Sequence, residues 1–443
     1  MIVTKFAGTS LADALAVRRV IQVIEERRAE RPVVVVSAHQ GVTDALQGLE
    51  RHPRPADALA AIGERHRRIA VELGLGSSEL DRIGADLATL GRWLLTRGRD
   101  GWTAEDRDRV VSHGELWSSR LVVAALRAAG IPSDWVDARH FMVTDDHFSD
   151  ATVNQAELAK RSARFLAPLL ASGRVPVTPG FIGTTADGRT TTLGRGGSDY
   201  TAALLGVALA AQRVELWSDA DGIMTADPAI VADARVIAET TYEEAADLAL
   251  FGARVPHPAT HGPLHGARIP CLVKNAKAPE RSGTVILRRD ERSEPAGAVR
   301  AVAIKRGVTS VSIRRDERTP AGDFLRTLAA SLARHDVRAA VLASSDRSAS
   351  VTVDDAALDG GLGTDLERLG SFQRRRGRSL IGLVGTELGN VARLANRIVT
   401  AMRHVETEII AHGGSDTSVA LVVRDDDGPE VVRRLHAEFV GMA

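Results

Sequence analysis

Short apolar segments alternate with polar loops and helical segments in the first part of the chain. Residues 1–6 are apolar, residues 7–10 form a polar turn, and apolar side chains then recur at helical spacing through residues 11–28. The next segment, 32–37, is rich in valine, as expected for a parallel strand that is covered on both faces. This alternation predicts an α/β domain built on a parallel sheet.

The same alternation continues to residue 274. Further strands are predicted at 131–137, 175–181, 214–219 and 271–274. Helices are predicted within 50–110 and at 116–129 and 200–211. Ligands of such sheets bind at the carboxyl ends of the strands, where the polar segments 5–10 and 37–44 lie. We therefore expect the functional residues of this domain at that edge of the sheet.

The pattern changes after residue 284. Residues 288–297 are charged and include Pro295 and Gly297, which predicts a linker. Residues 299–443 then show one order of elements twice: strand, helix, strand, strand. The predicted strands are 308–313, 337–342, 348–353, 380–384, 406–411 and 417–423, and the predicted helices are 321–335 and 390–403. Each copy is small for an independent core, so we expect the two to pair. The predicted domains are 1–290, 299–375 and 376–443.

A polar, glycine-rich segment, 190–201, joins a predicted strand to a helix of small residues. Backbone N–H groups at the start of a helix form an anion site, and glycines let the backbone approach a ligand closely. Arg195 adds a planar guanidinium suited to a carboxylate or phosphate, and Asp199 adds a carboxylate. Taken alone, an ordinary strand–loop–helix turn explains this segment equally well, because glycine-rich loops are common.

The composition excludes several classes of protein. The chain has 443 residues, which is too long for one ordinary core, and a formal net charge of +0, which offers no basic surface for nucleic acid. No apolar run reaches the roughly 18 residues of a membrane-spanning helix. Cys271 is the only cysteine, so an intramolecular disulfide and a cysteine-based zinc site are excluded. Residues 1–10 do not resemble a signal peptide, and we expect a cytoplasmic protein without nucleic-acid or membrane partners.

Five motifs occur in one order along the chain. They are Lys5-Phe-Ala-Gly-Thr-Ser10, Ser37-Ala-His-Gln-Gly-Val-Thr-Asp44, Ser112-His-Gly-Glu115, the segment 191–200, and Trp217-Ser-Asp-Ala-Asp-Gly-Ile-Met-Thr-Ala-Asp-Pro228. With this order and spacing the chain closely resembles aspartate kinases of the amino acid kinase superfamily. The resemblance covers the whole chain, because the paired C-terminal repeats resemble ACT domains. It implies an amino acid kinase-like parallel-sheet sandwich followed by two α+β ACT-like domains.

The resemblance implies transfer of the ATP γ-phosphoryl group to the side-chain carboxylate of aspartate, the first step towards lysine, threonine and methionine. The implied cofactors are ATP and Mg²⁺. Because the substrate carboxylate is itself the nucleophile, catalysis depends on positioning and on neutralising phosphoryl charge. Two alternatives stay open: a kinase for another amino acid carboxylate, and a weakened kinase that acts mainly as an amino acid sensor.

The resemblance also assigns site residues. Lys5 and Asp199 are the implied catalytic pair, with Lys5 holding the phosphates. The implied substrate-binding residues are Thr43, Glu115, Arg195 and Ser198, with Arg195 on the α-carboxylate and Glu115 on the α-ammonium. The implied ATP-binding residues are Lys5, Gly8, Thr9, Ser10, Ser218, Asp219, Met224, Arg254 and Val255.

Each of these roles has a structural alternative. Glu115 could serve the dipole of its own helix, Thr43 could be a helix cap, and Ser218 could be a plain turn residue beside Asp219. Three histidines spaced by four, His257, His261 and His265, invite a metal site, but Pro258 and Pro263 should break the helix that this spacing needs. We predict no metal site there.

Four positions depart from the family pattern: Ala7, Met224, Ala229 and Arg254 stand where glycine, tyrosine, arginine and lysine are usual. If position 7 requires a positive φ, alanine costs about 1 kcal/mol there. All four positions belong to the nucleotide side, so they bear on ATP affinity more than on the acceptor.

The ACT-like repeats imply homo-oligomers and an amino acid effector, lysine or threonine. The family's arrangement implies that residues 301–306 supply a strand to the unit formed mainly by 380–423. The candidate effector contacts are the loops 319–323 and 387–390, which precede helices. A dimerisation module without a ligand is the alternative.

Overall fold

The computed structural model describes residues 1–97, 101–292, 299–337, 339–359, 361–386, 388, 391–412 and 415–441. The core of the predicted linker, with Pro295 and Gly297, lies outside these residues, as do Glu387, Gly389 and Asn390 of one candidate effector loop. The chain divides into two compact units. The first unit comprises Met1–Gly222 and Pro256–Glu291, and the second comprises Ile223–Val255 and Arg292–Ala443.

The first unit is built on the predicted parallel sheet. Its strands are β1 (Ile2–Phe6), β2 (Pro32–Val36), β3 (Ser133–Trp135), β4 (Val175–Pro179), β7 (Val214–Ser218), β9 (Cys271–Asn275) and β10 (Thr284–Leu287). Their order across the sheet is β3-β4-β2-β1-β7-β9-β10, and the pairs are parallel except for β10 with β9. Every residue of β1 and β2 is buried, which explains their apolar sequences.

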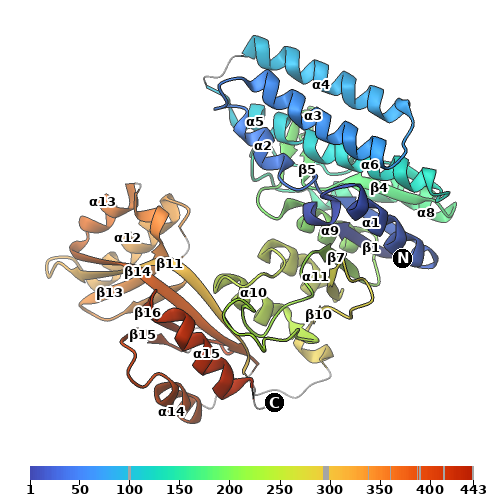
Figure 1. Cartoon of the computed structure of the whole chain (residues 1–443). Helices are drawn as coiled ribbons and strands as arrows, with labels where there is room; N and C mark the ends of the chain where they lie inside the picture. Colours follow the sequence, from blue (N-terminus) through green and yellow to red (C-terminus); the bar gives the residue numbers. More distant parts are fainter. Residues whose placement is uncertain are drawn as a thin grey trace. The chain divides into compact units, whose positions relative to one another are not determined.

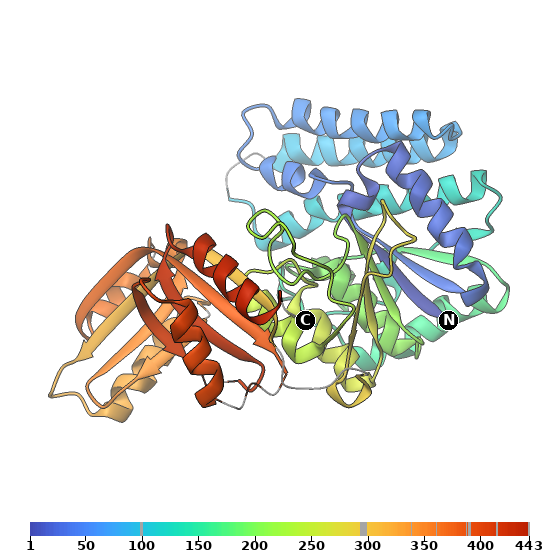
Figure 2. The same ribbon diagram turned by 60° about the horizontal axis from the view of Figure 1, so that its bottom comes forward.

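Helices cover this sheet in layers. The helices of the first unit are α1 (Ala14–Glu26), α2 (Val42–Gly48), α3 (Pro55–Glu72), α4 (Ser77–Arg97), α5 (Ala104–Val111), α6 (His113–Ala128), α7 (Gln155–Phe165), α8 (Ala167–Ala171), α9 (Gly197–Ala208) and α11 (His261–Ala267). One core joins α1 and α6 to the valines of β2, while α9 contacts β1, β2 and β7. Helices α3 and α4, blue in Figure 2, form an outer layer that packs against α6.

A short hairpin precedes α9. Its strands, β5 (Ile182–Thr184) and β6 (Thr190–Thr192), pair antiparallel outside the main sheet. The hairpin brings the glycine-rich segment to the start of α9, where Gly196 is the residue before the helix. Strand ends, a hairpin and a helix start therefore meet at one edge of the first unit.

The second unit is an antiparallel sheet with helices. Its sheet strands are β11 (Val299–Arg315), β12 (Val341–Ser344), β13 (Ser348–Asp354), β14 (Gly370–Gly385), β15 (Thr407–Ala411) and β16 (Ser418–Arg424), in the order β12-β13-β11-β14-β16-β15. Its helices are α10 (Tyr242–Leu250), α12 (Ala321–Arg334), α13 (Gly361–Glu367), α14 (Val391–Ala401) and α15 (Gly428–Phe439), and the short strand β8 (Glu239–Thr241) precedes α10. The fold class is the predicted one, a parallel α/β part followed by α+β repeats.

Two long strands, β11 and β14, run side by side through this sheet (Figure 1). Residues 301–305 of β11 pair with 380–384 of β14, and residues 308–314 of β11 pair with β13. Each long strand thus contributes to two hydrophobic cores, one with α14 and α15 and one with α12 and α13.

The segment 223–255 groups with this second unit through its own packing. A Cβ at Gly382 of β14 would collide with the ring of Phe251, so glycine is required for this close approach. Ala226 and Val231 join the core that contains α15. The predicted domain boundaries 1–290, 299–375 and 376–443 stay a prediction.

Among the described residues, none of the helices combines the length and the apolar character that a membrane span requires.

Candidate active site

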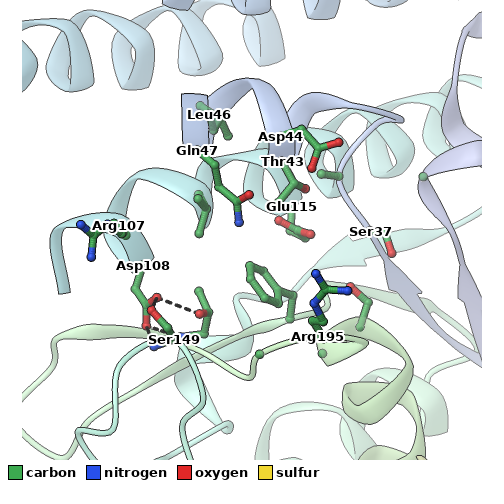
Figure 3. A pocket seen from close by; sticks show the side chains of 18 of the residues that line it. Ser37, Thr43, Asp44, Leu46, Gln47, Arg107, Asp108, Glu115, Ser149 and Arg195 are labelled. Atoms are coloured by element: carbon green, nitrogen blue, oxygen red, sulfur yellow. Dashed lines mark hydrogen bonds between the residues drawn. The ribbon is translucent and has the colours of Figure 1, made fainter. Parts of the chain in front are cut away.

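A cavity of about 970 Å³ lies in the first unit, at the edge where β1 and β2 end. Three stretches form its walls: residues 37–51, the corner between α5 and α6, and the segment 192–199 (Figure 3). Among the predicted site residues, the cavity is lined by Lys5, Gly8, Thr43, Glu115, Arg195, Ser198 and Asp199. The structure therefore brings together residues that are nearly two hundred positions apart in the sequence.

Lys5 and Asp199 form an ion pair in this cavity. Lys5 Nζ lies 2.6 Å from Asp199 Oδ1, and the two side chains are only 10% and 19% exposed. Strand β1 is central in the sheet and fixes Lys5, and the first turn of α9 fixes Asp199. Because a buried charge is costly without a partner, the pair holds both side chains in place.

The loop before α9 is shaped by two glycines. Gly194 and Gly196 have φ values of +70° and +69°, and a Cβ at Gly196 would collide with the His257 ring. This backbone leaves Arg195 exposed on the cavity wall. Within the described part of the chain, Arg195 makes no ion pair. The loop thus presents a guanidinium beside the N-terminus of a helix, where anions are favoured.

Glu115 places a buried carboxyl group on the cavity wall. It is 4% exposed, and burial raises its pKa to about 8, against the opposing effects of the Ala38 backbone N–H and the charge of Lys5. Its Oε2 is buried and accepts no hydrogen bond from the described residues. Figure 3 shows Glu115 and Arg195 on facing walls of the cavity.

Thr43 belongs to helix α2 and lines the cavity. The residue before this helix is Gly41, with φ +76°, and no side chain caps the helix. Thr43 lies inside α2, at its second position, so the alternative that it caps the helix is wrong.

The turn after β1 is close to the loop after β2. A Cβ at Gly8 would lie 2.8 Å from the Ala38 carbonyl oxygen, and Gln40 N donates to the Gly8 carbonyl at 3.1 Å. Ala7 has φ −70°, an extended conformation, so the strain considered for alanine at this position does not arise. The hydroxyl of Ser10 donates to the Trp217 carbonyl at 3.1 Å.

The remaining predicted nucleotide residues are not part of this cavity. Thr9 Oγ1 is buried without a hydrogen-bond partner among the described residues. Ser218 Oγ accepts a hydrogen bond from Ala220 N at 3.2 Å, as a turn residue does, and Asp219 is exposed. Met224, Arg254 and Val255 belong to the second unit, whereas the residues that line the cavity belong to the first.

The three histidines fall on a 3₁₀ turn and α11. His257 precedes the turn, and His261 and His265 both lie on α11, so the expectation that Pro263 would interrupt this helix is wrong. Proline is tolerated there because the first helical turn needs no N–H donor. Among the described residues, no three His, Cys, Asp or Glu side chains gather in a way that could hold a metal ion.

Sequence reasoning placed Ser37 at the functional edge of the sheet without giving it a role, and it missed Asp108 as a cavity residue. Ser37 follows β2, so its position at a strand end was the available signal. Asp108 lies inside α5, is 1% exposed, and accepts hydrogen bonds from Ser149 and Thr192. Burial raises the pKa of Asp108 despite these hydrogen bonds. Its partners are distant in sequence, so no local pattern could reveal it.

Two neutral histidines pack together at the cavity, His39 in its lining and His66 against His39. His39 Nδ1 is 2.5 Å from the Leu11 carbonyl, His66 Nδ1 is 2.8 Å from the Ile62 carbonyl, and the two ring centroids are 5.0 Å apart. Burial lowers the pKa of His39 to about 3 and that of His66 to about 4. This part of the core therefore depends on uncharged imidazoles.

Comparison with known proteins identifies the family. A model of the amino acid kinase family matches residues 1–275, and an ACT domain model matches residues 381–439. The lysine-sensitive aspartokinase 3 of Escherichia coli (strain K12) is 34% identical over 99% of both chains. The chloroplastic aspartokinase 2 of Arabidopsis thaliana is 31% identical over 99% of this chain and 84% of its own.

Solved structures agree with this result. The crystal structure of E. coli aspartokinase III in complex with aspartate and ADP (R-state) matches with a TM-score of 0.88 and 34% identity, over 99% of each chain. The structure of the same enzyme in complex with lysine and aspartate (T-state) matches with a TM-score of 0.83, again over 99% of each chain. The amino acid kinase model covers more than half of the chain, and relatives called aspartokinases cover 99% of it. The chain therefore belongs to the aspartokinases of the amino acid kinase family.

Proposed function

We propose that the cavity of the first unit is where this chain transfers the γ-phosphoryl group of ATP to the side-chain carboxylate of aspartate. The family makes the chain an ATP-dependent aspartate kinase. One observation carries the proposal. The Lys5–Asp199 ion pair shares a cavity with the exposed guanidinium of Arg195 and with Glu115, whose Oε2 has no hydrogen-bond partner among the described residues.

The acceptor is held by complementary charges in this proposal. Arg195 binds the α-carboxylate, because a guanidinium offers paired donors to a carboxylate. Glu115 binds the α-ammonium, and Thr43 and Ser198 complete the wall. The aspartate–ADP complex of the E. coli relative supports the same substrates here. An ammonium beside Glu115 would lower its raised pKa, so aspartate binding near neutral pH should release a proton.

Phosphoryl transfer rests on Lys5 and Asp199. Lys5 places a positive charge where the transferring group gains negative charge, and Asp199 keeps Lys5 in position. Gly8 and the first turn of α9 offer backbone N–H groups to phosphate oxygens. Mg²⁺ neutralises phosphate charge in kinases, and the carboxylate of Asp199 is an oxygen ligand of the kind it prefers.

The nucleotide residues outside the cavity are assigned by resemblance. Thr9 and Ser10 follow β1, while Ser218 ends β7 and Asp219 follows it. Because β1 and β7 are parallel neighbours in the sheet, both turns lie at the same edge. The buried hydroxyl of Thr9, without a partner in the described residues, is available for a ligand. Met224, Arg254 and Val255 are proposed as nucleotide-binding residues by the resemblance alone.

The second unit is proposed to regulate the kinase. The lysine-sensitive E. coli relative and its T-state complex with lysine support lysine as the effector, with threonine as the alternative. Residues 319–323, at the start of α12, are the proposed contact within the described residues. Association of ACT-like domains into a homo-oligomer, and a cytoplasmic location, belong to the same proposal.

A coupled ADP-release assay with aspartate, glutamate and N-acetylaspartate tests the function. The proposal predicts strong turnover with aspartate and little with the other two. Preference for glutamate or another analogue would favour a specialised kinase. Weak turnover with all three, together with a thermal shift on adding lysine or threonine, would favour the sensor alternative.

A further inference from the structure

Asp108 is a buried carboxylate that joins separate walls of the active-site cavity (Figure 3). Its Oδ2 accepts from the backbone N–H of Ser149 at 2.9 Å and of Thr192 at 2.7 Å. Its Oδ1 accepts from the hydroxyls of the same two residues at 3.2 and 2.8 Å. Since Asp108 is only 1% exposed, water does not replace these contacts easily.

The hydrogen-bond partners of Asp108 connect it to the loop that carries Arg195. Thr192 ends β6, three positions before Arg195, and Ala151 N donates to the Thr192 carbonyl at 2.9 Å. Ser149 has φ +73°, an unfavourable conformation for serine, and its hydrogen bonds to Asp108 hold it there. The neighbouring Asp150 lies against Gly194, because a Cβ at Gly194 would be 2.6 Å from Asp150 Oδ1.

Backbone hydrogen bonds connect Asp108 to the first turn of the helix that carries Glu115. Ser112 N donates to the Asp108 carbonyl at 3.1 Å, and Leu116 N donates to the Ser112 carbonyl at 3.2 Å. Helices α5 and α6 are separated by Ser112 alone. A shift of Asp108 relative to its hydroxyl partners would therefore change the separation between the Glu115 helix and the Arg195 loop.

We propose that Asp108 is a positioning residue that fixes the distance between Glu115 and Arg195 and thereby sets the affinity and selectivity for the amino acid acceptor. This inference rests on the proposed function, in which these two residues bind the α-ammonium and the α-carboxylate. Asp108 itself takes no part in phosphoryl transfer. Its effect reaches the acceptor and leaves the nucleotide side, formed by Lys5 on β1 and Gly8 in the turn after it, unchanged.

The test is a comparison of KM values for aspartate and ATP in Asp108→Asn. Asparagine keeps the shape, and its carbonyl oxygen can still accept from the two backbone N–H groups. Its NH₂ group must then donate to the two hydroxyls instead of accepting from them, and all four hydrogen bonds lose the charged acceptor. We expect the KM for aspartate to rise at least tenfold, the KM for ATP to stay within twofold, and the preference for aspartate over glutamate to fall. Equal changes in both KM values, or a loss of thermal stability alone, would overturn the inference.

Asp106→Asn is the matched control on the same helix. Asp106 caps α5 with Thr103 and pairs with Arg97 at 2.8 Å, but it does not line the cavity. It should lower thermal stability and leave both KM values unchanged. A rise in the aspartate KM of Asp106→Asn like that of Asp108→Asn would reduce Asp108 to a general stabiliser of α5.

Ser149→Ala and Thr192→Val keep the test decisive if Asp108→Asn does not fold. Each removes one hydroxyl donor and keeps the backbone N–H, so we expect a two- to fivefold rise in the aspartate KM with unchanged ATP KM. No change in either variant would contradict the inference. Arg195→Ala tests the proposed acceptor site separately from the positioning role of Asp108. If Arg195→Ala raises the aspartate KM while the Asp108, Ser149 and Thr192 variants do not, only the positioning role fails. If Arg195→Ala also has no effect, the proposed acceptor site fails.

Discussion

The first turn of α6 in the first unit and the first turn of α10 in the second each contain a buried glutamate. Glu115 and Glu244 both stand at the third position of their helices and are 4% and 1% exposed. Glu244 is fully engaged: its Oε2 accepts from Thr240 Oγ1 and Thr241 N at 2.9 Å, and its Oε1 lies 3.2 Å from Arg292. The Oε2 of Glu115 has no partner among the described residues.

This difference separates a structural carboxylate from a candidate ligand-binding one. Glu244 forms a capping box with Thr241 and so serves its own helix. Helix α6 has no side-chain cap at Ser112, so Glu115 forms no capping box there. A buried carboxyl group with a raised pKa on a cavity wall is instead typical of a group that binds a charged ligand.

The largest expected effect comes from Lys5→Ala. Because Lys5 supplies the positive charge that pairs with Asp199, kcat should fall about a hundred- to a thousandfold, the cost of removing one group that stabilises transition-state charge. Steady-state kinetics measure this, and circular dichroism confirms folding. Lys160→Ala, which removes an exposed lysine of α7, is the control and should keep normal turnover. Near-normal turnover in folded Lys5→Ala would refute the role of Lys5.

Glu244→Gln and Glu115→Gln should differ in stability. Glu244→Gln breaks a buried ion pair and should lower the free energy of unfolding by about 3 kcal/mol. Glu115→Gln should leave that free energy unchanged or raise it, because burial already disfavours the charged form of Glu115. Urea denaturation measures both. Equal destabilisation by the two substitutions would remove the distinction between them.

Arg195→Ala should raise the KM for aspartate by about ten- to a hundredfold, the loss of a charged hydrogen bond of roughly 1.5–3 kcal/mol. The KM for ATP should change little. Arg189→Ala is the matched control, because Arg189 lies just before β6 and pairs with Asp187 but does not line the cavity. A rise confined to the ATP KM would move the acceptor site elsewhere.

The buried histidines should make the protein sensitive to acid. Their folded-state pKa values, about 3 for His39 and about 4 for His66, lie below the ordinary value of 6.5. The unfolded chain therefore binds protons first, and stability that is complete above pH 6.5 is lost as the pH falls towards 4. Replacing His66 by Phe should reduce this slope by about 1.4 kcal/mol per pH unit. Urea denaturation between pH 7 and 4.5 measures it, and an unchanged slope would show that His66 does not titrate in this way.

The sequence predicts the parallel sheet well because its strands are short, apolar and buried on both faces, as β2 shows. It predicts the second unit less completely. Residues 301–306 and 308–313 read as separate strands, but β11 is continuous, since Gly307 takes φ +70° beside a register shift between Lys305 and Val308. The first part of β14 carries Arg374, Arg375 and Arg376 on exposed positions, so its apolar pattern is too weak to read.

Site residues at strand and helix ends were predictable for a physical reason. The polar segments 5–10 and 37–44 follow apolar strands, where the fold places ligands, so the edge that holds the site was predictable. The roles of Lys5, Thr43 and Asp199 came from the resemblance to aspartate kinases. Asp108 was not predictable, because its burial depends on Ser149 and Thr192, which only the folded chain brings to it. The conformation of Ala7 was also beyond the sequence, since its φ is set by the turn into Gly8–Leu11.

The central claim is that Glu115 binds the ammonium of the acceptor, and the pH dependence of aspartate affinity tests it most directly. Isothermal titration with ADP present, from pH 6 to 8, would compare the unmodified chain with Glu115→Gln. Because binding requires the ionised carboxylate and its pKa is about 8, affinity should rise about tenfold per pH unit below pH 7.5 and then level off. Glu115→Gln should bind weakly and without this dependence. The same pH-independent affinity in both proteins would contradict the account.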